Sequence, residues 1–170
     1  GVQRTAELGA GWLNFGVANA EEAVQDMAGA WQAAGHGADT LDANLFFLGA
    51  VLTGDEAEDE RRLMTQAAPA TSVIFHNLAD EVGPMGGANL EIGPLSNVLA
   101  QYLKVHEEYE PADARYLQNH KGHLMYVRPE ETHITPELVK ATSLSGTREE
   151  LIERLRSIKH AGYSQVTVQL

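Results

Sequence analysis

Histidine is the residue type in this chain whose chemistry follows most directly from its spacing. Four histidines fall within residues 106–133: His106, His120, His123 and His133. The stretch His120-Lys-Gly-His123 brings two imidazoles close along the chain, and imidazole titrates near neutral pH. His120 and His123 are therefore candidates for lining a substrate pocket or for proton transfer. The alternative is that they are loop histidines held by ordinary backbone hydrogen bonds.

A metal site is not expected from this spacing. Helix-borne zinc motifs place two histidines at i and i+4 with a glutamate between them, a pattern that His120 and His123 do not match. Spacing also supplies no third ligand. The chain has no cysteine, which excludes disulfides, zinc–thiolate sites and thiol nucleophiles together.

The first residues are a second candidate, for binding an anionic group. Gly1 directly precedes a short predicted helix, and the free backbone N–H groups and dipole of a helix start attract phosphate. The backbone of Gly1, Val2 and Gln3 and the charge of Arg4 would form such a site. A plain connecting helix is the other interpretation, because a lone glycine is a weak motif.

Two further segments occupy positions typical of binding sites. Asn14 and Phe15 end a predicted strand, and parallel-sheet proteins bind ligands at the carboxyl ends of strands. The alternative is that they are ordinary strand-end residues. Residues 83–87 read Gly-Pro-Met-Gly-Gly, without the lysine and hydroxyl residue of a phosphate-binding loop. We expect a mobile loop or lid there rather than a nucleotide site.

Composition limits the classes of protein to consider. A length of 170 residues fits one domain, and the formal net charge of −12 argues against nucleic-acid binding. No stretch approaches the run of about 18 apolar residues that a membrane helix needs, and the first residues lack a signal-peptide pattern. A soluble, cytoplasmic protein is the expectation.

The end of the chain predicts the fold class. Thr147 and Glu150 form a capping box that starts a helix, and Gly162 ends it. An alternating, β-branched strand follows at 165–170. A helix that leads directly into a strand is typical of parallel α/β sheets.

The other predicted elements surround a long excursion between the second and third strands. Strands are predicted at 12–15, 41–52 and 165–170, and residues 53–146 are mostly helical. Helices are predicted at 2–8, 19–35, 55–67, 70–80, 95–109, 112–120 and 137–141. Asn19 and Glu22 form a capping box for the second of these helices, and Thr135 caps the last. Pro69 is expected to interrupt the helical region between 67 and 70.

Short motifs along the chain carry a family resemblance. They read Thr5-Ala-Glu-Leu-Gly-Ala-Gly-Trp12 at the start, and Leu144-Ser-Gly-Thr-Arg-Glu-Glu-Leu151 with Ala161-Gly-Tyr-Ser-Gln-Val166 at the end. Between them lie His120-Lys-Gly-His-Leu-Met125 and Ile134-Thr-Pro-Glu-Leu138. Together they resemble the luciferase-like oxidoreductases, a TIM-barrel family that uses flavin or coenzyme F420. The two middle motifs are similar to a subgroup that includes F420 enzymes, and Ala10 stands where the family commonly has aspartate.

The resemblance implies an α/β fold that is a partial (β/α)8 TIM barrel. Residues 1–170 would form a single domain, the C-terminal half of the barrel, with a long helical insertion before the last strand. A whole barrel has about 250 residues or more, and three parallel strands cannot close one. Strands 12–15 and 165–170 would leave open edges. We expect the sequence to be a fragment, or to pair with a second copy or with a separate N-terminal half.

The resemblance also implies a function. The intact protein would be an oxidoreductase or monooxygenase that acts on a small molecule with FMN or coenzyme F420. The amides of Gly1, Val2 and Gln3, with Arg4, would hold the cofactor phosphate. Asn14, His120 and His123 would line the substrate pocket, and no catalytic residue is assigned. The alternative is a non-catalytic binding or interaction module that assembles through its open sheet edges.

Overall fold

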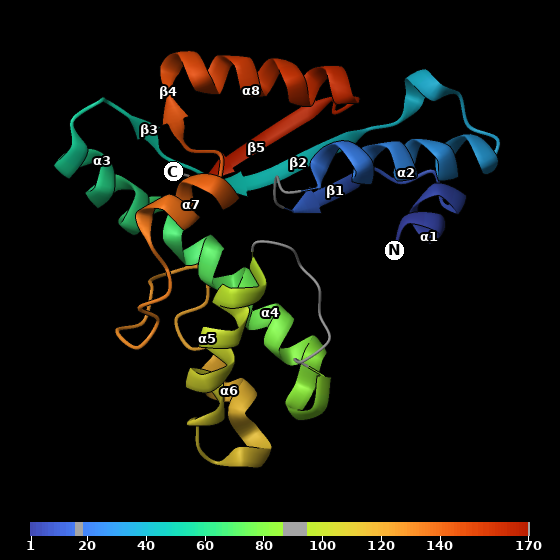
Figure 1. Cartoon of the computed structure of the whole chain (residues 1–170). Helices are drawn as coiled ribbons and strands as arrows, with labels where there is room; N and C mark the ends of the chain where they lie inside the picture. Colours follow the sequence, from blue (N-terminus) through green and yellow to red (C-terminus); the bar gives the residue numbers. More distant parts are fainter. Residues whose placement is uncertain (16–18, 87–94, 170) are drawn as a thin grey trace.

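The computed structural model describes residues 1–15, 19–86 and 95–169, and its centre is a parallel three-stranded sheet (Figure 1). Strands β1 (Trp12–Phe15), β2 (Ala43–Leu48) and β5 (Gln165–Gln169) lie in the order β1-β2-β5. Leu45 of β2 pairs with Asn14 on one side and with Val166 on the other. The strands predicted at 12–15 and at 165–170 and the parallel arrangement are confirmed within the described residues, and β1 and β5 are the edges of this sheet.

Helices cover one face of the sheet. The buried residues Ala43, Leu45 and Phe47 of β2 form a core with residues of the two helices that flank the sheet. These helices are α2 (Ala20–Ala33) and α8 (Arg148–Ala161), and α1 (Val2–Glu7) packs in turn against α2. Buried and half-buried residues alternate along β2 from Ala43 to Phe47, as the two-residue period of a strand predicts.

The opposite face of the sheet is open and exposes large apolar side chains of β1. Leu13 is 64% exposed and Phe15 is 46% exposed. Phe15 stacks on Phe46 of the neighbouring strand, with ring centroids 5.6 Å apart. Parallel sheets are ordinarily covered on both faces, whereas within the described residues this sheet is covered on one face only.

A helical excursion leaves the sheet after β2 and returns before α8 (Figure 1). Its two ends meet in a short parallel pair, in which Val51 lies opposite Gly146. The remaining elements are, in chain order, η1 (Ala38–Thr40), β3 (Val51–Leu52), α3 (Glu56–Arg62), the π-helical turn η2 (Leu63–Ala67), α4 (Ala68–Gly86), α5 (Ser96–Glu107), η5 (Ala112–Ala114), α6 (Arg115–Asn119), α7 (Pro136–Thr142) and β4 (Gly146–Thr147). The excursion has its own core, which includes Phe75, Leu99, Tyr102, Ile134 and Val139.

Most of the predicted helix starts are confirmed. Thr147 and Glu150 make both hydrogen bonds of the capping box at α8. Asp55 accepts a hydrogen bond at the start of α3, and Thr135 does so at the start of α7. The box predicted at Asn19 is wrong, because the Asn19 side chain makes no capping hydrogen bond at its backbone φ of −126° and ψ of 30°.

The single strand predicted over 41–52 is wrong. The chain leaves the sheet at Gly49 and Ala50, and β3 pairs with β4 instead. The cause is a close approach of two backbones: a Cβ on Gly49 would lie 2.1 Å from the carbonyl oxygen of Leu144. The N–H of Ala50 also donates to Ser145 Oγ at 3.0 Å, which fixes the bend.

Two predictions about helix interruptions are also corrected. Pro69 does not break the helix: α4 begins at Ala68, directly after the π-helical turn η2, and continues through Pro69. The departure from α-helical hydrogen bonding thus falls directly before the residue that has no N–H to donate. Helix α4 continues to Gly86, so residues 83–86 are helical rather than a loop, and Gly87 lies outside the described residues. No helix in the described part of the chain is long and apolar enough to cross a membrane.

Candidate functional site

Helix α4 carries two polar side chains on one face. His76 and Asp80 are four positions apart, so one helical turn places them side by side. The helix is fixed here because Phe75 and Ala79 are buried in the core of the excursion. The His76 side chain is only 3% exposed, whereas the Asp80 side chain is 35% exposed. The face therefore runs from the protein interior toward solvent.

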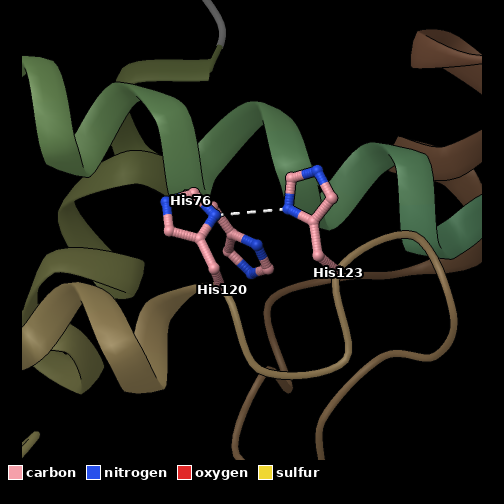
Figure 2. Close-up of side chains that lie close together, drawn as sticks. All are labelled: His76, His120 and His123. Carbon is pink, nitrogen blue, oxygen red and sulfur yellow. Dashed lines mark hydrogen bonds between the residues drawn. The ribbon is translucent and has the colours of Figure 1, made fainter.

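The turn after α6 brings two more imidazoles to this face. The N–H of His123 donates to the carbonyl oxygen of His120 at 3.2 Å. Gly122 has a φ of +74°, in the left-handed region that favours glycine, and a Cβ there would lie 2.5 Å from the ring of Tyr126. The turn holds the Nδ1 atoms of His120 and His123 3.2 Å apart (Figure 2).

A buried asparagine attaches this turn to α4. Asn119 is fully buried, and its Nδ2 donates to the carbonyl oxygen of His76 at 3.0 Å and to Asp80 Oδ1 at 2.8 Å. The hydroxyl of Tyr102 on α5 donates to Asn119 Oδ1. Three elements are thus joined at one side chain, and the turn has a fixed position against His76.

The result is a cluster of three imidazoles (Figure 2). His76, His120 and His123 each offer one nitrogen, and these nitrogens all lie within 4.8 Å of one another. His76 is buried, His120 is half-buried and His123 is exposed. Among the described residues this is the group whose geometry suits a metal ion. We refer to it below as the histidine cluster.

A buried ion pair supports the interior end of the cluster. His76 Nε2 lies 2.5 Å from Glu131 Oε1, and Arg128 Nη2 donates to the same oxygen at 2.7 Å. The N–H of Arg128 donates to Glu131 Oε2 at 2.8 Å. Burial alone would raise the pKa of Glu131, but the hydrogen bonds from His76 and Arg128 outweigh it and lower this pKa to about 2. Glu131 is therefore ionised and acts only as an acceptor.

Two tyrosines complete the surroundings of this ion pair. Arg128 Nη2 donates to the Tyr102 hydroxyl at 3.0 Å, and the Arg128 guanidinium lies over the ring of Tyr109, 5.1 Å from its centroid. Burial raises the pKa of Tyr102 to about 12, and burial also raises the pKa of Tyr109. Both phenols are consequently neutral donors at physiological pH.

A second carboxylate supports the solvent end of the cluster. His120 Nε2 lies 2.6 Å from Asp80 Oδ2. Partial burial, with the neighbouring His120 and His76, lowers the pKa of His123 below the ordinary histidine value. One ring nitrogen of His76 thus faces Glu131, and one ring nitrogen of His120 faces Asp80. The second nitrogen of each ring does not face a carboxylate in these contacts.

Comparison with known proteins shows the family of the chain. The sequence profile of the luciferase-like monooxygenases matches residues 1–165. The chain belongs to the luciferase-like monooxygenase family. A search of curated proteins finds no match. Among solved structures, the coenzyme F420-dependent tetrahydromethanopterin reductase from Methanopyrus kandleri is similar in fold, with a TM-score of 0.53 and 14% sequence identity. The likeness covers 98% of this luciferase-like chain and 41% of that reductase chain.

The predicted phosphate-binding residues of this luciferase-like chain lie apart from the histidine cluster. Gly1 precedes α1, and within the described residues no atom beyond its chain neighbour lies within 4 Å of the position a Cβ on Gly1 would take. Arg4 Nη1 pairs with Glu7 Oε2 at 3.0 Å, and both side chains are exposed. In Figure 1 the N-terminus and α1 lie on the side of the sheet, away from α4 and α6. The structure therefore brings together His120 and His123 but not Gly1–Arg4 with them.

Asn14 lies on the sheet, where its side chain is hydrogen-bonded to Tyr163. Its Nδ2 donates to the Tyr163 hydroxyl at 2.8 Å, and that hydroxyl donates to the carbonyl oxygen of Ala20 at 2.8 Å. Through Tyr163, Asn14 thus links β1 to the turn between α8 and β5 and to the start of α2, on the face that the helices cover. Its strand neighbour Phe15 points to the open face.

The sequence patterns of this luciferase-like chain did not single out the cluster's third histidine or its carboxylate partners. His76 and Asp80 have the i, i+4 spacing of one helix face, which is the signal that could have found them. Glu131 lies 55 positions from His76 along the chain, so no local pattern connects them. His106 and His133 stay outside the cluster and pack on Tyr102, with ring centroids 6.3 Å and 5.1 Å from its ring.

Proposed function

We propose that this chain is part of an FMN- or F420-dependent oxidoreductase, in which it supplies the C-terminal half of a (β/α)8 barrel. Membership of the luciferase-like monooxygenase family, matched over residues 1–165, supports an oxidoreductase. The chain spans 41% of the length of the F420-dependent reductase that it resembles in fold, which supports a longer intact enzyme.

The open face of the sheet is the observation that carries this proposal. Leu13 and Phe15 are large apolar residues, 64% and 46% exposed, on a parallel sheet with helices on its other face only within the described residues. In a closed barrel the face opposite the helices points into the interior, where side chains of the other strands fill it. Additional strands that continue from β1 or β5 would cover Leu13 and Phe15.

The start of α1 fits a phosphate group in part. The first backbone N–H groups of a helix have no partner within it, and the position next to Gly1 is free of other atoms. Arg4 adds a cation, whose pair with Glu7 is exposed and therefore weak. We propose that Gly1, Val2, Gln3 and Arg4 hold the phosphate of FMN or F420. The cofactor would supply the redox chemistry, and the chain would bind and orient it.

Asn14, His120 and His123 remain our proposal for the substrate side. His120 and His123 lie in a turn tied to α4 through Asn119, so their rings have a defined direction. His123 is exposed, which allows contact with a small molecule. Asn14 sits on the strand whose carboxyl end is Phe15, the end at which parallel-sheet enzymes bind their ligands.

The reading frame upstream of Gly1 tests this proposal first. A continuous frame that encodes further alternating strands and helices is the expected result. A start codon directly upstream of Gly1 would contradict the half-barrel assignment and favour the interaction module.

Sedimentation of the isolated chain gives a second test. A half barrel with open edges is expected to self-associate, and co-expression with the upstream segment is expected to yield a single species containing one copy of each part. Failure of the two parts to associate would argue against a shared barrel.

A further inference from the structure

We propose that His76, His120 and His123 bind one divalent transition-metal ion, with Zn²⁺ as the preferred ion. The three imidazoles come from two separate elements, helix α4 and the turn after α6, and one nitrogen of each ring lies within 4.8 Å of one nitrogen of each of the others (Figure 2). Neutral imidazole nitrogen is a common ligand of Zn²⁺ and of neighbouring first-row ions. This inference does not depend on the proposed flavin or F420 chemistry.

The hydrogen bonds of His76 leave one nitrogen for the ion. Its Nε2 lies 2.5 Å from Glu131 Oε1 and 3.0 Å from Arg128 Nη2. Glu131 is ionised opposite Arg128 and can only accept, so in the shorter of these contacts Nε2 carries the proton and donates it. Its Nδ1 is buried and has no hydrogen-bond partner among the described residues. A buried lone pair without a partner is costly for a purely structural histidine, and a metal ion would satisfy it.

His120 and His123 supply the other two nitrogens. His120 Nε2 faces Asp80 Oδ2 at 2.6 Å, which leaves Nδ1 as its lone pair. The Nδ1 atoms of His120 and His123 lie 3.2 Å apart. Two nitrogens on one tetrahedral Zn²⁺, with bonds of about 2.05 Å, lie about 3.3 Å apart. The spacing of this pair therefore already matches shared coordination, and the exposed ring of His123 is free to turn toward His76.

The partners of the imidazoles match the usual surroundings of a metal site. Metal-bound histidines ordinarily donate their second N–H to a carboxylate, which fixes the tautomer and the ring direction. Glu131 does this for His76, and Asp80 does it for His120. The same arrangement on two of three imidazoles would be unusual for histidines that only fill space.

The local charge and the type of ligand favour a transition metal over other cations. Asp80 and Glu131 carry negative charge beside the cluster, and Arg128 offsets one of these charges through its ion pair. Ca²⁺ and Mg²⁺ prefer oxygen ligands, so a set of three nitrogens excludes them. Three protein ligands leave a fourth position, which faces solvent at His123 and is open to water or to a small-molecule oxygen.

Metal titration of the purified protein that carries this whole chain tests the site. After chelator treatment and buffer exchange, Co²⁺ is added and visible absorption is recorded, and Zn²⁺ binding is measured by calorimetry. We expect one ion per chain and the intense visible bands of four-coordinate Co²⁺, which Zn²⁺ displaces. Unchanged spectra and no heat of Zn²⁺ binding would overturn the proposal, whatever the outcome of the cofactor experiments.

Variants decide whether these residues are the ligands. His123→Ala removes an exposed ring and is expected to weaken Zn²⁺ binding at least 10-fold, and Asp80→Asn is expected to weaken it about 10-fold through loss of the His120 orientation. His160→Ala is the matched control, because His160 is an exposed residue of α8 whose ring is hydrogen-bonded to the Arg156 carbonyl of its own helix. Equal affinity in His123→Ala and His160→Ala would overturn the assignment.

A stability measurement distinguishes the loss of a Zn²⁺ ligand from the misfolding of a variant. Zn²⁺ is expected to raise the Tm of the parent and of His160→Ala in proportion to the logarithm of its concentration, and to raise that of His123→Ala much less. An equal rise in all three proteins would place the ion elsewhere and contradict the proposal.

Discussion

His76 Nε2 and Glu131 Oε1 lie 2.5 Å apart in the interior of the helical excursion, although 55 positions separate them along the chain. Both side chains are almost completely buried, at 3% and 0% exposure. Arg128 completes the group from the same segment as Glu131. This contact orients the imidazole on α4 and neutralises a charge that could not otherwise remain inside the protein.

Glu131→Gln should destabilise the protein strongly. The change leaves the buried guanidinium of Arg128 without its counter-charge, and breaking a buried pair in this way costs about 3 kcal/mol or more. Urea unfolding followed by circular dichroism measures the loss. Glu149→Gln is the matched control, since its pair with Arg148 is highly exposed and should contribute nothing measurable. Similar stability of the two variants would contradict the account of the ion pair.

Tyr102→Phe should cost about 1–3 kcal/mol of unfolding free energy. The Tyr102 hydroxyl donates to Asn119 and accepts from Arg128, so its removal leaves two buried groups short of a partner. The same urea experiment detects this change. Tyr116→Phe removes a hydroxyl from a ring that is 57% exposed, and no loss is expected there. A harmless Tyr102→Phe would show that Asn119 does not rely on this contact.

Stability should rise as the pH is raised toward about 6.5, the ordinary pKa of histidine. Burial lowers the pKa of His133, His106 and His123 in the folded chain, so the unfolded chain binds more protons as the pH falls below 6.5. The contribution of these histidines to the free energy of unfolding is fully present above their pKa in the unfolded chain. It is lost as the pH falls through their lower pKa in the folded chain. In His133→Leu the pH dependence of the unfolding free energy should be smaller. A slope identical to that of the parent would refute a contribution from His133.

Gly49→Ala should destabilise the protein by about 1–3 kcal/mol through overpacking. The new Cβ would lie 2.1 Å from the Leu144 carbonyl oxygen, so the two backbone segments would have to separate. Gly29→Ala is the control with the opposite sign. Gly29 lies within α2 with no atom within 4 Å of its Cβ position, and alanine there should stabilise by about 0.5–1 kcal/mol. Chemical unfolding of both variants decides whether the close approach at Gly49 is obligatory.

Local signals in the sequence predicted the elements that depend on neighbouring residues. The caps at Asp55, Thr135 and Thr147 each use a partner within three positions, and the strands at 12–15 and 165–169 follow alternation. The break after β2 was not predictable in this way. It results from contact between Gly49 and Leu144, which meet only after the helical excursion has folded.

The difference between local signals and contacts between distant residues also explains which residues of the site could be predicted. The proximity of His120 and His123 follows from their spacing and from Gly122, and the structure confirms that the two rings are neighbours. His76 lies in a helix whose strongest pattern is its apolar core face, and its partners are far away in the sequence. The third imidazole and both carboxylates could therefore be recognised only in three dimensions.

Equilibrium binding of FMN and of coenzyme F420 to the full-length protein tests the central claim, that this chain belongs to a cofactor-dependent oxidoreductase barrel. Each oxidised cofactor is titrated separately while its visible absorption and fluorescence are followed. We predict saturable binding of one of the two cofactors by the full-length protein, weakened in Arg4→Ala, and weak or no binding by residues 1–170 alone. Absence of binding of either cofactor to the folded full-length protein would contradict the claim.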